Sequence, residues 1–251
     1  MSKRLQVCWI SAGVSSFVAG WLEKENTDQY IYIDIADQHK DSLRFIRDCE
    51  KELKKEVQIL MSDTYANVEE ACMAAGIIRS VKGFAPCTAY LKKRVRSEWE
   101  EKHKDCEITY VWGFDVGERG RAERIQDAMP QFEHKFPLIE NGLTKEDCHG
   151  ILARLGIARP VMYDLGYSNN NCIGCVKGGM GYWNKIRKDF PEVFADRAAL
   201  ERKLNSRCLK QCFLDELPPD AGRQTDEIMQ DCGIFCELAI LGGSDNEGMA
   251  G

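Results

Sequence analysis

The feature that most constrains the fold is a repeated order of strand, turn and helix along the first half of the chain. Four short runs rich in β-branched and aromatic residues predict strands at 5–10, 30–35, 57–61 and 108–112. Segments between and after them predict helices at 17–24, at 41–53, from Thr88 and from Arg119. Strands that alternate with helices pair in parallel, because each helix returns the chain to the same end of the sheet. The sequence therefore predicts an α/β fold with a doubly wound, mainly parallel sheet.

The last part of the chain differs in composition and shows no alternation of strands with helices. Thr144, followed by acidic residues, predicts a helix that runs to Leu155 and is closed by Gly156. A Gly- and Asn-rich stretch and further helices at 182–189 and 196–204 come after it. We therefore expect an α/β core at 1–140 and a Cys-rich, mostly helical region at 141–251, together forming one structural domain.

Composition and charge exclude several classes of protein. Hydrophobic residues make up 44% of the 251 residues and charged residues 29%, which excludes disordered and fibrous chains. No run reaches the roughly 20 apolar residues that cross a bilayer, and the N-terminus makes a poor signal peptide. The formal net charge of −6 argues against a polyanion binder held by bulk charge. We expect a cytoplasmic protein without a membrane partner.

The chain contains 12 cysteines, an unusual number for a protein with no secretory signal. In a reducing compartment such cysteines act as metal ligands, nucleophiles or buried apolar residues more often than as disulfides. We expect Cys8 to be buried on a strand, and Cys49 and Cys72 on the inner faces of helices. Cys208 and Cys212, four residues apart on a predicted helix, have no further ligand set beside them.

Cys172 and Cys175 form a Cys-x-x-Cys pair in the Gly- and Asn-rich stretch. This spacing lets two thiolates reach one metal without backbone strain. A tetrahedral metal or a cluster needs four ligands, so the pair is incomplete by itself. The alternative is a pair of half-buried thiols on a loop.

Residues 11–16, between the first predicted strand and its helix, form a Ser- and Gly-containing turn. In an open α/β sheet, ligands bind at the carboxyl ends of the strands, and a helix N-terminus offers free N–H groups to phosphate. The hydroxyls of Ser11, Ser15 and Ser16 can donate further hydrogen bonds. The alternative is a tight connection that binds nothing.

This turn resembles the PP-loop, usually Ser-Gly-Gly-x-Asp-Ser, of the adenine nucleotide alpha hydrolase superfamily, and in particular its phosphoadenosine phosphosulfate (PAPS) reductase branch. Four further stretches resemble that branch in the expected order: the second strand and helix at 32–45, the Cys-Thr/Cys-x-x-x-Lys helix start at 86–93, the Gly-x-Arg-x-x-Glu-x-x-Arg loop at 113–122, and the iron–sulfur Cys-x-x-Cys region at 171–179. The last stretch also looks like that of a phage and bacterial subgroup. The similarity spans residues 5–238.

The resemblance implies an adenine nucleotide with its phosphate or sulfate end on residues 11–16. The residues implied in binding are Ser11, Gly13, Ser15, Ser16, Asp34, Lys92, Glu118 and Arg121. For Lys92 and Arg121, a solvated charge or surface ion pair is the alternative. Ser15 stands where ATP-cleaving members have an aspartate, which removes a Mg²⁺-associated carboxylate and favours the sulfonucleotide branch. Ala12 replaces a glycine and Asp115 replaces an arginine of the family pattern.

The resemblance also implies a metal centre. It adds Cys87 to Cys172 and Cys175, with Cys232 or Cys236 as the fourth ligand. Thiolate ligands favour an iron–sulfur cluster, expected as [4Fe–4S], or zinc as the alternative.

Residues 231–235 resemble the Glu-Cys-Gly-Leu-His segment that carries the nucleophilic cysteine of PAPS and APS (adenosine phosphosulfate) reductases, although Phe235 replaces the histidine. In that mechanism a thiolate attacks the sulfur of the sulfonucleotide, and a second thiol then frees sulfite. Cys232 is the expected nucleophile and Cys236 the resolving thiol, with the role of metal ligand as the rival assignment for Cys232.

The expected function is thus a PAPS reductase-like enzyme that reduces PAPS or APS to sulfite with thioredoxin or glutaredoxin as reductant. The alternative is an iron–sulfur-dependent, ATP-using sulfur transferase that thiolates nucleic acid, and only this alternative has a nucleic-acid partner. Whether the protein is a homodimer is left open by the sequence.

Overall fold

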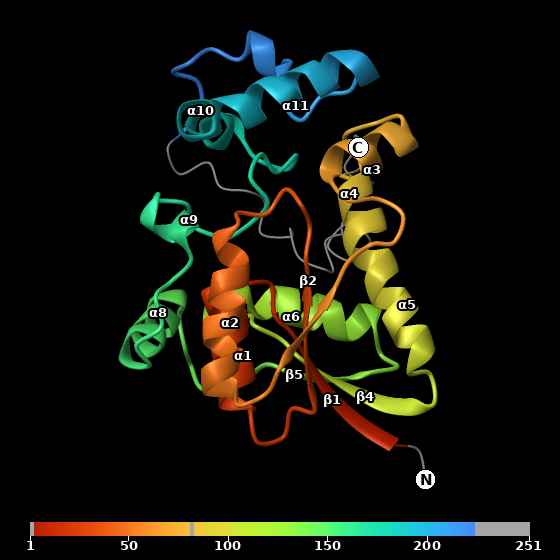
Figure 1. Ribbon diagram of the computed structural model, residues 1–251, viewed down its shortest axis with the longest axis vertical. Coiled ribbons are helices and arrows are strands. Elements are labelled where there is room, and N and C mark those ends of the chain that lie inside the picture. The colour runs from red at the N-terminus through yellow and green to blue at the C-terminus, as the bar shows by residue number, and fades with distance from the viewer. Residues whose placement is uncertain (1–2, 81–82, 224–251) are drawn as a thin grey trace, which may run out of the picture. The chain divides into compact units, whose positions relative to one another are not determined.

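The computed structural model describes residues 3–80 and 83–223, which form two compact units (Figure 1). The first, here called the sheet unit, contains residues 1–34, 39–60 and 98–170. The second, here called the helical unit, contains residues 35–38, 61–97 and those after 170. The chain passes between the units several times, so each unit is built from segments distant in sequence.

The sheet unit is organised around five parallel strands: β1 (Lys3–Trp9), β2 (Gln29–Ile33), β3 (Val57–Leu60), β4 (Cys106–Val111) and β5 (Glu133–Lys135). Their order is β3-β2-β1-β4-β5, and every pairing is parallel. Helices cover both faces, which confirms the predicted doubly wound α/β architecture. β5 was not predicted, because three residues with Glu, His and Lys give no apolar run.

The strand order creates a switch point between β1 and β4. From β1 the chain proceeds to β2 and β3 on one side, and then returns to place β4 and β5 on the other. In open α/β sheets, ligands bind at such a switch point, beside the loops that follow the two strands. The predicted PP-loop-like turn directly follows β1.

Seven helices of the sheet unit connect and cover the strands: α1 (Val14–Leu22), α2 (Asp41–Leu53), α5 (Arg94–Lys102, shared with the helical unit), α6 (Arg119–Ala128), α7 (Pro137–Glu140), α8 (Lys145–Arg154) and α9 (Val161–Asp164). Phe17 of α1 packs edge-on against Phe45 of α2, with ring centroids 6.1 Å apart. On α5, Trp99 packs edge-on against Trp9 of β1, at 5.6 Å. The predicted Thr144 cap is confirmed, because Thr144 and Asp147 form a reciprocal capping box at the start of α8.

The buried positions predicted for three cysteines are confirmed. Cys8 on β1, Cys49 on α2 and Cys72 on α3 (Val68–Ala75) are each 0% exposed. Burial raises the pKa of the Cys8 and Cys72 thiols to about 12, because the thiolate is poorly solvated there. These thiols are therefore neutral at physiological pH and pack as small apolar side chains.

The helical unit contains α3 (Val68–Ala75), α4 (Pro86–Thr88), the π-helical segment η1 (Ala89–Lys93), α10 (Met180–Asp189), α11 (Pro191–Leu204) and the 3₁₀ turn η3 (Leu214–Glu216). The prediction that a helix carries Cys208 and Cys212 is wrong, because residues 206–213 contain only bends and irregular backbone. The buried carboxylate of Glu201 accepts the backbone N–H groups of Cys208 and Leu214. This side chain satisfies donors that a helix would otherwise have paired.

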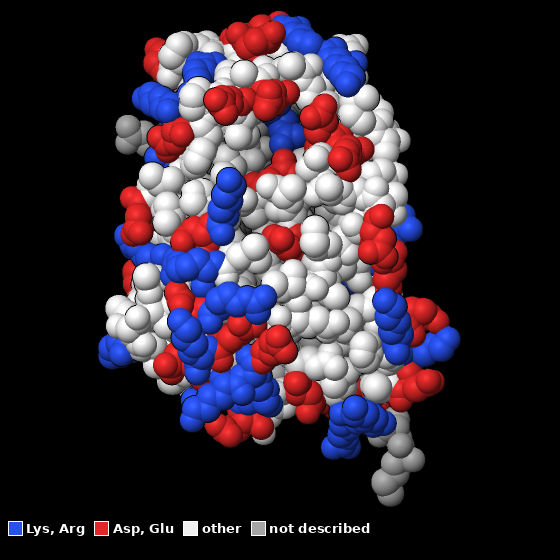
Figure 2. All heavy atoms as spheres, viewed as in Figure 1, with Lys and Arg blue, Asp and Glu red and all other residues white. Residues whose placement is uncertain are grey.

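Charged side chains of both signs are intermixed over α2 and its neighbours, in the lower part of Figure 2. Many of them pair along α2, as Arg47 does with Glu50 and Lys51 with Asp48. Such exposed pairs contribute little stability individually but prevent a patch of one sign. None of the helices within the described ranges is long and apolar enough to cross a membrane.

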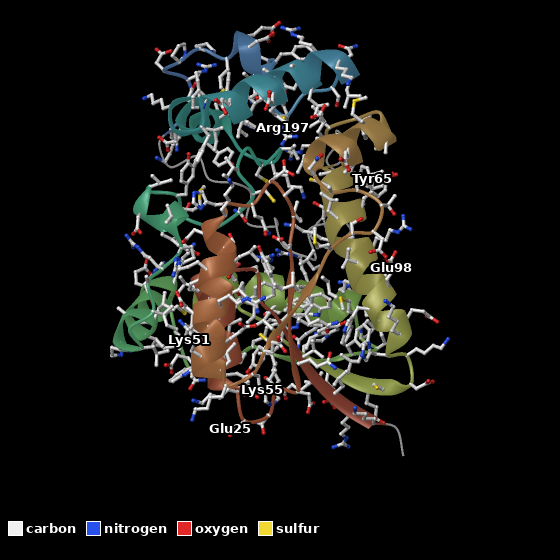
Figure 3. All side chains as sticks on the ribbon, in the orientation of Figure 1. Glu25, Lys51, Lys55, Tyr65, Glu98 and Arg197 are labelled. Atoms are coloured by element: carbon white, nitrogen blue, oxygen red, sulfur yellow. The ribbon has the colours of Figure 1, made fainter. Side chains whose placement is uncertain are left out.

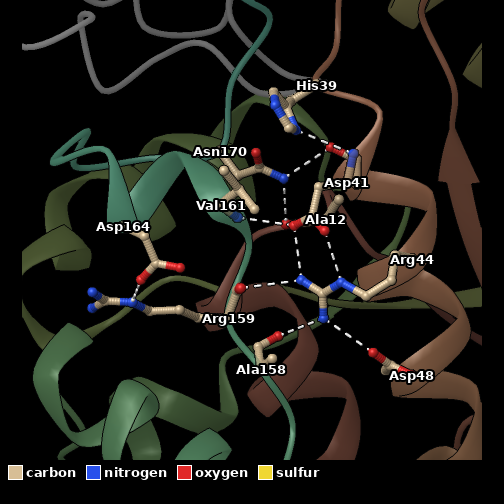
Figure 4. Close-up of polar contacts among 11 residues, drawn as sticks. Ala12, His39, Asp41, Arg44, Asp48, Ala158, Arg159, Val161, Asp164 and Asn170 are labelled. Carbon is tan, nitrogen blue, oxygen red and sulfur yellow. Dashed lines mark hydrogen bonds and ion pairs between the residues drawn. The ribbon is translucent and has the colours of Figure 1, made fainter.

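One partly buried ion pair ties α2 to the segment between α8 and α9 (Figure 4). Arg44 donates two hydrogen bonds to the carboxylate of Asp41, at 2.8 and 2.7 Å, and others to the carbonyls of Ala158 and Arg159. The same carboxylate accepts the backbone N–H of Val161 at 2.9 Å. The planar guanidinium fork thus fixes the backbone that leads into α9.

We predict that Asp41→Asn destabilises the protein by about 1–3 kcal/mol at neutral pH, because it weakens several charge-assisted hydrogen bonds. Hydrogen bonding from Arg44 lowers the pKa of the Asp41 carboxyl. The stabilisation is therefore present above the ordinary pKa of an aspartate and is lost as the pH falls through the lower, folded-state pKa. Urea unfolding of both proteins between pH 7 and pH 3 checks this.

Glu101→Gln is the matched control, since Glu101 pairs with Lys104 on an exposed surface. Its effect should stay below about 0.5 kcal/mol at every pH. An Asp41→Asn effect that is as small as the control, or that does not shrink in acid, would contradict the role given to this ion pair.

Candidate functional site

The turn after β1 adopts a conformation typical of glycine. Ala12 has a φ of 55°, in the left-handed region, at the position where the resembling loop carries glycine. Ala12 is 1% exposed, and its carbonyl accepts a 2.9 Å hydrogen bond from the side-chain amide of Asn170. The surrounding contacts therefore hold an alanine in a conformation that costs about 1 kcal/mol.

Helix α1 begins directly after this turn. Gly13 is its N-cap residue, with an extended φ of −99°, and has no side chain to cap the helix. The first turn of a helix presents backbone N–H groups, and the helix dipole gives this end a partial positive charge. This end of α1 lies at the switch point of the sheet.

The three serines of the turn have different environments. The Ser16 hydroxyl donates to the Gly13 carbonyl at 2.9 Å and accepts the backbone N–H of Ser11 at 3.1 Å, so it braces the turn. The Ser15 hydroxyl contacts the thiol of Cys148 on α8. Ser11 is exposed, and its hydroxyl lies 3.2 Å from that of Ser16. Ser11 is therefore the serine of the turn best placed to meet a ligand.

Two residues from the end of the sheet unit complete this site. The hydroxyl of Tyr163 on α9 accepts the N–H of Val14, the first helical residue of α1, at 3.4 Å. Asn170, 7% exposed, donates both to the Ala12 carbonyl and to the hydroxyl of Ser42 on α2, at 2.9 and 3.0 Å (Figure 4). These contacts fasten the turn to α2 and α9.

The loop after β4 lies against the start of α1 through Gly113. A Cβ atom on Gly113 would lie 2.5 Å from the Cα and 2.7 Å from the backbone N of Ser16. No Cβ atom tolerates such distances, so only glycine allows this approach. The first glycine of the stretch that resembles the Gly-x-Arg loop therefore has a packing role next to the serine turn.

The rest of that loop forms the 3₁₀ turn η2 (Val116–Glu118), which leads directly into α6. Asp115 accepts the backbone N–H of Gly117 at 2.8 Å, and Glu118 accepts the N–H of Asp115, so that the two residues form a capping box. Arg121 forms a 2.8 Å ion pair with Glu118, both about 17% exposed, and its guanidinium lies over the Phe114 ring. Asp115, which replaces the family's arginine, thus acts as a helix cap.

The other two residues implied in nucleotide binding lie elsewhere. Asp34 follows β2 at the carboxyl edge of the sheet, and its carboxylate accepts a hydrogen bond from Tyr32 at 3.4 Å. Lys92 lies on η1 in the helical unit. Single π-helical turns are frequent at functional sites. The nucleotide-binding roles of Asp34, Lys92, Glu118 and Arg121 stay predictions.

The Cys-x-x-Cys loop of the helical unit is organised by one tyrosine. The hydroxyl of Tyr182 accepts the backbone N–H of Cys175 at 2.9 Å and donates to the carbonyl of Cys172 at 3.2 Å. Cys172 and Cys175 are 8% and 5% exposed. A Cβ on Gly178 would lie 1.9 Å from the Tyr182 ring, so the loop closes tightly over this side chain.

The helical unit also contains a buried arginine. Arg197, 5% exposed, projects from α11 (Figure 3) and pairs with Asp37 at 3.1 Å. The thiols of Cys72, Cys87 and Cys208 all lie within electrostatic range of its guanidinium. Cys87 therefore shares the electrostatic surroundings of Arg197 with Cys72 and Cys208, which the sequence spacing did not indicate.

Two of the cysteines expected to bind a metal lie together in the described residues. Cys172 and Cys175 share a fixed, buried loop, and their chemistry suits iron–sulfur or zinc. Among residues 3–80 and 83–223, no three His, Cys, Asp or Glu side chains are grouped to hold a metal ion. Cys232 and Cys236, the expected nucleophile, resolving thiol or fourth ligand, lie outside the described residues. The metal and catalytic assignments stay predictions.

Comparison with known proteins gives no relative: no model of a protein family matches the chain, and no curated protein matches it.

Sequence analysis missed the residues that hold the serine turn in place. Tyr163 is 149 positions from Val14, and no local pattern indicates that the two meet. Asp41, Ser42 and Arg44 lie in a stretch that resembles the family, but their spacing shows only a helix start. An Asp-x-x-Arg pair in a first helical turn is a common local ion pair, and its use as a clamp depends on tertiary structure.

We predict that Gly113→Ala destabilises the protein by about 1–3 kcal/mol, because the new methyl group must push the backbone of α1 away from β4. Thermal or urea unfolding measures this. Gly120→Ala is the matched control, since a Cβ there meets nothing closer than Arg124 at 3.7 Å and alanine favours the helix. Equal stability of the two variants would show that α1 moves at no cost.

We predict that Tyr182→Phe increases the alkylation rates of Cys172 and Cys175 and destabilises the protein by about 1–3 kcal/mol, because it leaves a buried N–H without its acceptor. Rates are measured by iodoacetamide labelling and peptide mass spectrometry. Tyr65→Phe is the control. The Tyr65 ring stacks on the Tyr90 ring, with centroids 5.4 Å apart, and Tyr65 does not supply the hydroxyl that bonds Cys172 and Cys175. Unchanged alkylation rates would mean that Tyr182 does not order the loop.

Proposed function

We propose that the protein binds an adenine nucleotide in the sheet unit, with its phosphate or sulfate end against residues 11–13 and the start of α1. The observation that carries the proposal is the N-terminus of α1, which begins after a glycine N-cap at the switch point of an all-parallel sheet, directly after a small-residue turn. The left-handed residue at position 12 and the contact with Gly113 supply the close backbone packing that such a turn needs.

Gly13 adds a place for the anion. A Cβ atom at Gly13 would lie 3.3 Å from the Ser11 hydroxyl and 3.5 Å from the Tyr163 hydroxyl. Both hydroxyls therefore lie beside Gly13, and a ligand oxygen in van der Waals contact with Gly13 on this side would be within reach of them. The donors named here are neutral, which suits a sulfate or phosphate that needs several short hydrogen bonds.

We further propose that the bound nucleotide is PAPS or APS and that its sulfur is reduced to sulfite. The support is the resemblance of five stretches to PAPS reductases, together with the serine at position 15, which directs its hydroxyl to Cys148 and supplies no carboxylate for Mg²⁺. The Cys232 thiolate attacks the sulfur of the sulfonucleotide and forms an S–S bond with it. The bond between that sulfur and the nucleotide oxygen breaks, and the nucleotide leaves. A second thiol, from Cys236 or thioredoxin, then attacks the cysteine sulfur, which releases sulfite and forms a disulfide.

A thiolate-bound metal accompanies this proposal. Cys172, Cys175 and Cys87 would hold it with one of the two C-terminal cysteines, and an iron–sulfur cluster held in this way would supply redox-active iron. The chain's own contribution is the Tyr182 hydroxyl, which fixes the backbone of the first two ligands.

We predict that PAPS or APS binds the wild-type protein and that Gly13→Ala weakens binding at least tenfold without unfolding the protein. The extended φ of Gly13 suits alanine, so the methyl group adds no backbone strain but projects between the two hydroxyls and keeps an anion from lying against residue 13. Isothermal titration of anaerobically purified protein with PAPS, APS and ATP gives the affinities.

Gly150→Ala on α8 is the control, because a Cβ there meets only Arg154 at 3.6 Å. It should bind as the wild type does. Failure of the wild type to bind all three nucleotides would refute the nucleotide site. Binding of PAPS or APS without sulfite release in the presence of thioredoxin or dithiothreitol would retain the site and refute the reductase.

A further inference from the structure

We propose that Tyr163 is a ligand-binding residue whose phenolic O–H donates a hydrogen bond to the terminal anionic group of the bound nucleotide. This inference rests on the proposed nucleotide site but assigns a residue that none of the sequence motifs contains. Tyr163 belongs to α9 and lies in the same unit as the turn at residues 11–13.

The position of Tyr163 is fixed before any ligand arrives. The Asp41 carboxylate binds the N–H of Val161 at the start of the same short helix, and Arg44 binds the two carbonyls that precede Pro160. The ring packs edge-on against the His149 ring, with centroids 4.8 Å apart. The phenol is therefore held at the N-terminus of α1 by contacts with α2 and α8.

Hydrogen-bond accounting shows where the phenolic proton can go. The Tyr163 oxygen accepts the backbone N–H groups of Val14 and Asn170. A phenol accepts with its lone pairs and donates one proton, so both contacts leave the proton available. Within the described residues, no acceptor for that proton is found.

The serine hydroxyls of the turn are committed to one another. Ser16 donates to the Gly13 carbonyl, so in the 3.2 Å contact between the two hydroxyls Ser11 is the donor. Ser15 is engaged with Cys148. Tyr163 is thus the hydroxyl at this turn that can donate to a ligand without first breaking a contact.

The geometry around Gly13 gives this donor a target. The Tyr163 and Ser11 hydroxyls flank the position that a Cβ of Gly13 would take, at 3.5 and 3.3 Å. An anionic oxygen that lies over Gly13, next to that position, would accept from the phenol at the start of α1. Burial raises the pKa of Tyr163, so the phenol stays protonated and able to donate throughout the physiological range.

The test compares Tyr163→Phe with Tyr30→Phe in the full-length protein, with PAPS and APS as probes in the absence of reductant. Tyr30 is the matched control, because its hydroxyl donates to the Gly20 carbonyl in the second half of the same helix, at 2.9 Å. We expect Tyr163→Phe to weaken binding about tenfold or more, as for a lost hydrogen bond to a charged group. Tyr30→Phe should bind both probes as the wild type does.

The outcomes separate this inference from the proposed function. Wild-type binding with equal affinity of Tyr163→Phe would overturn the role of the phenol and retain the nucleotide site. Absence of wild-type binding would overturn both. Adenosine as a third probe sharpens the test, since it has no phosphate or sulfate and its affinity should be the same for the wild type and Tyr163→Phe.

A second measurement does not depend on the folding of the variant. With 3-fluorotyrosine at the 8 tyrosine positions, ¹⁹F spectra of the wild type report on each phenol. The Tyr163 resonance is assigned by conservative replacement with phenylalanine, or by site-specific incorporation of fluorotyrosine at position 163. A shift of this resonance with PAPS but not with adenosine supports the contact, and an unchanged resonance at saturating PAPS refutes it.

Discussion

The close approach of β4 to the start of α1 is the constraint on which the candidate site depends. Parallel pairing of β1 with β4 brings the ends of both strands to one edge of the sheet, and Gly113 lets the backbone after β4 touch Ser16. Any side chain at position 113 would have to push these two backbone segments apart. The serine turn, the first turn of α1 and the capped 3₁₀ turn before α6 are therefore positioned by one glycine contact and the sheet beneath it.

A second set of contacts fixes the turn from the other side. Arg44 and Asp41 hold the backbone before α9, while Asn170 joins the Ala12 carbonyl to the Ser42 hydroxyl. These groups come from α2 and from the last part of the sheet unit, so the turn is braced by segments distant in sequence. In the helical unit, Tyr182 plays the corresponding part for the Cys172 and Cys175 loop. In both places a neutral polar side chain sets the shape of a loop that carries the candidate chemistry.

Strand and helix order could be predicted from the sequence because β1, β2, β3 and β4 are apolar runs whose periodicity differs from that of the helices. β5 escaped prediction, since pairing with β4 stabilises a three-residue strand that has no apolar pattern of its own. The irregular segment with Cys208 and Cys212 did so too, because the buried Glu201 carboxylate pairs its N–H groups. The serine turn was found from its place between strand and helix, whereas Tyr163 and Asn170 reach it only through tertiary folding.

Ala12 shows how the turn is prepared for its role. A buried alanine in the left-handed region is held there by packing and by the Asn170 amide, and its methyl group reduces the number of conformations that the chain can sample. The entropy of ordering this turn is therefore lost during folding, before a ligand is present. Under the proposed function, a ligand would meet a turn that is already ordered, so its association would not wait for loop rearrangement.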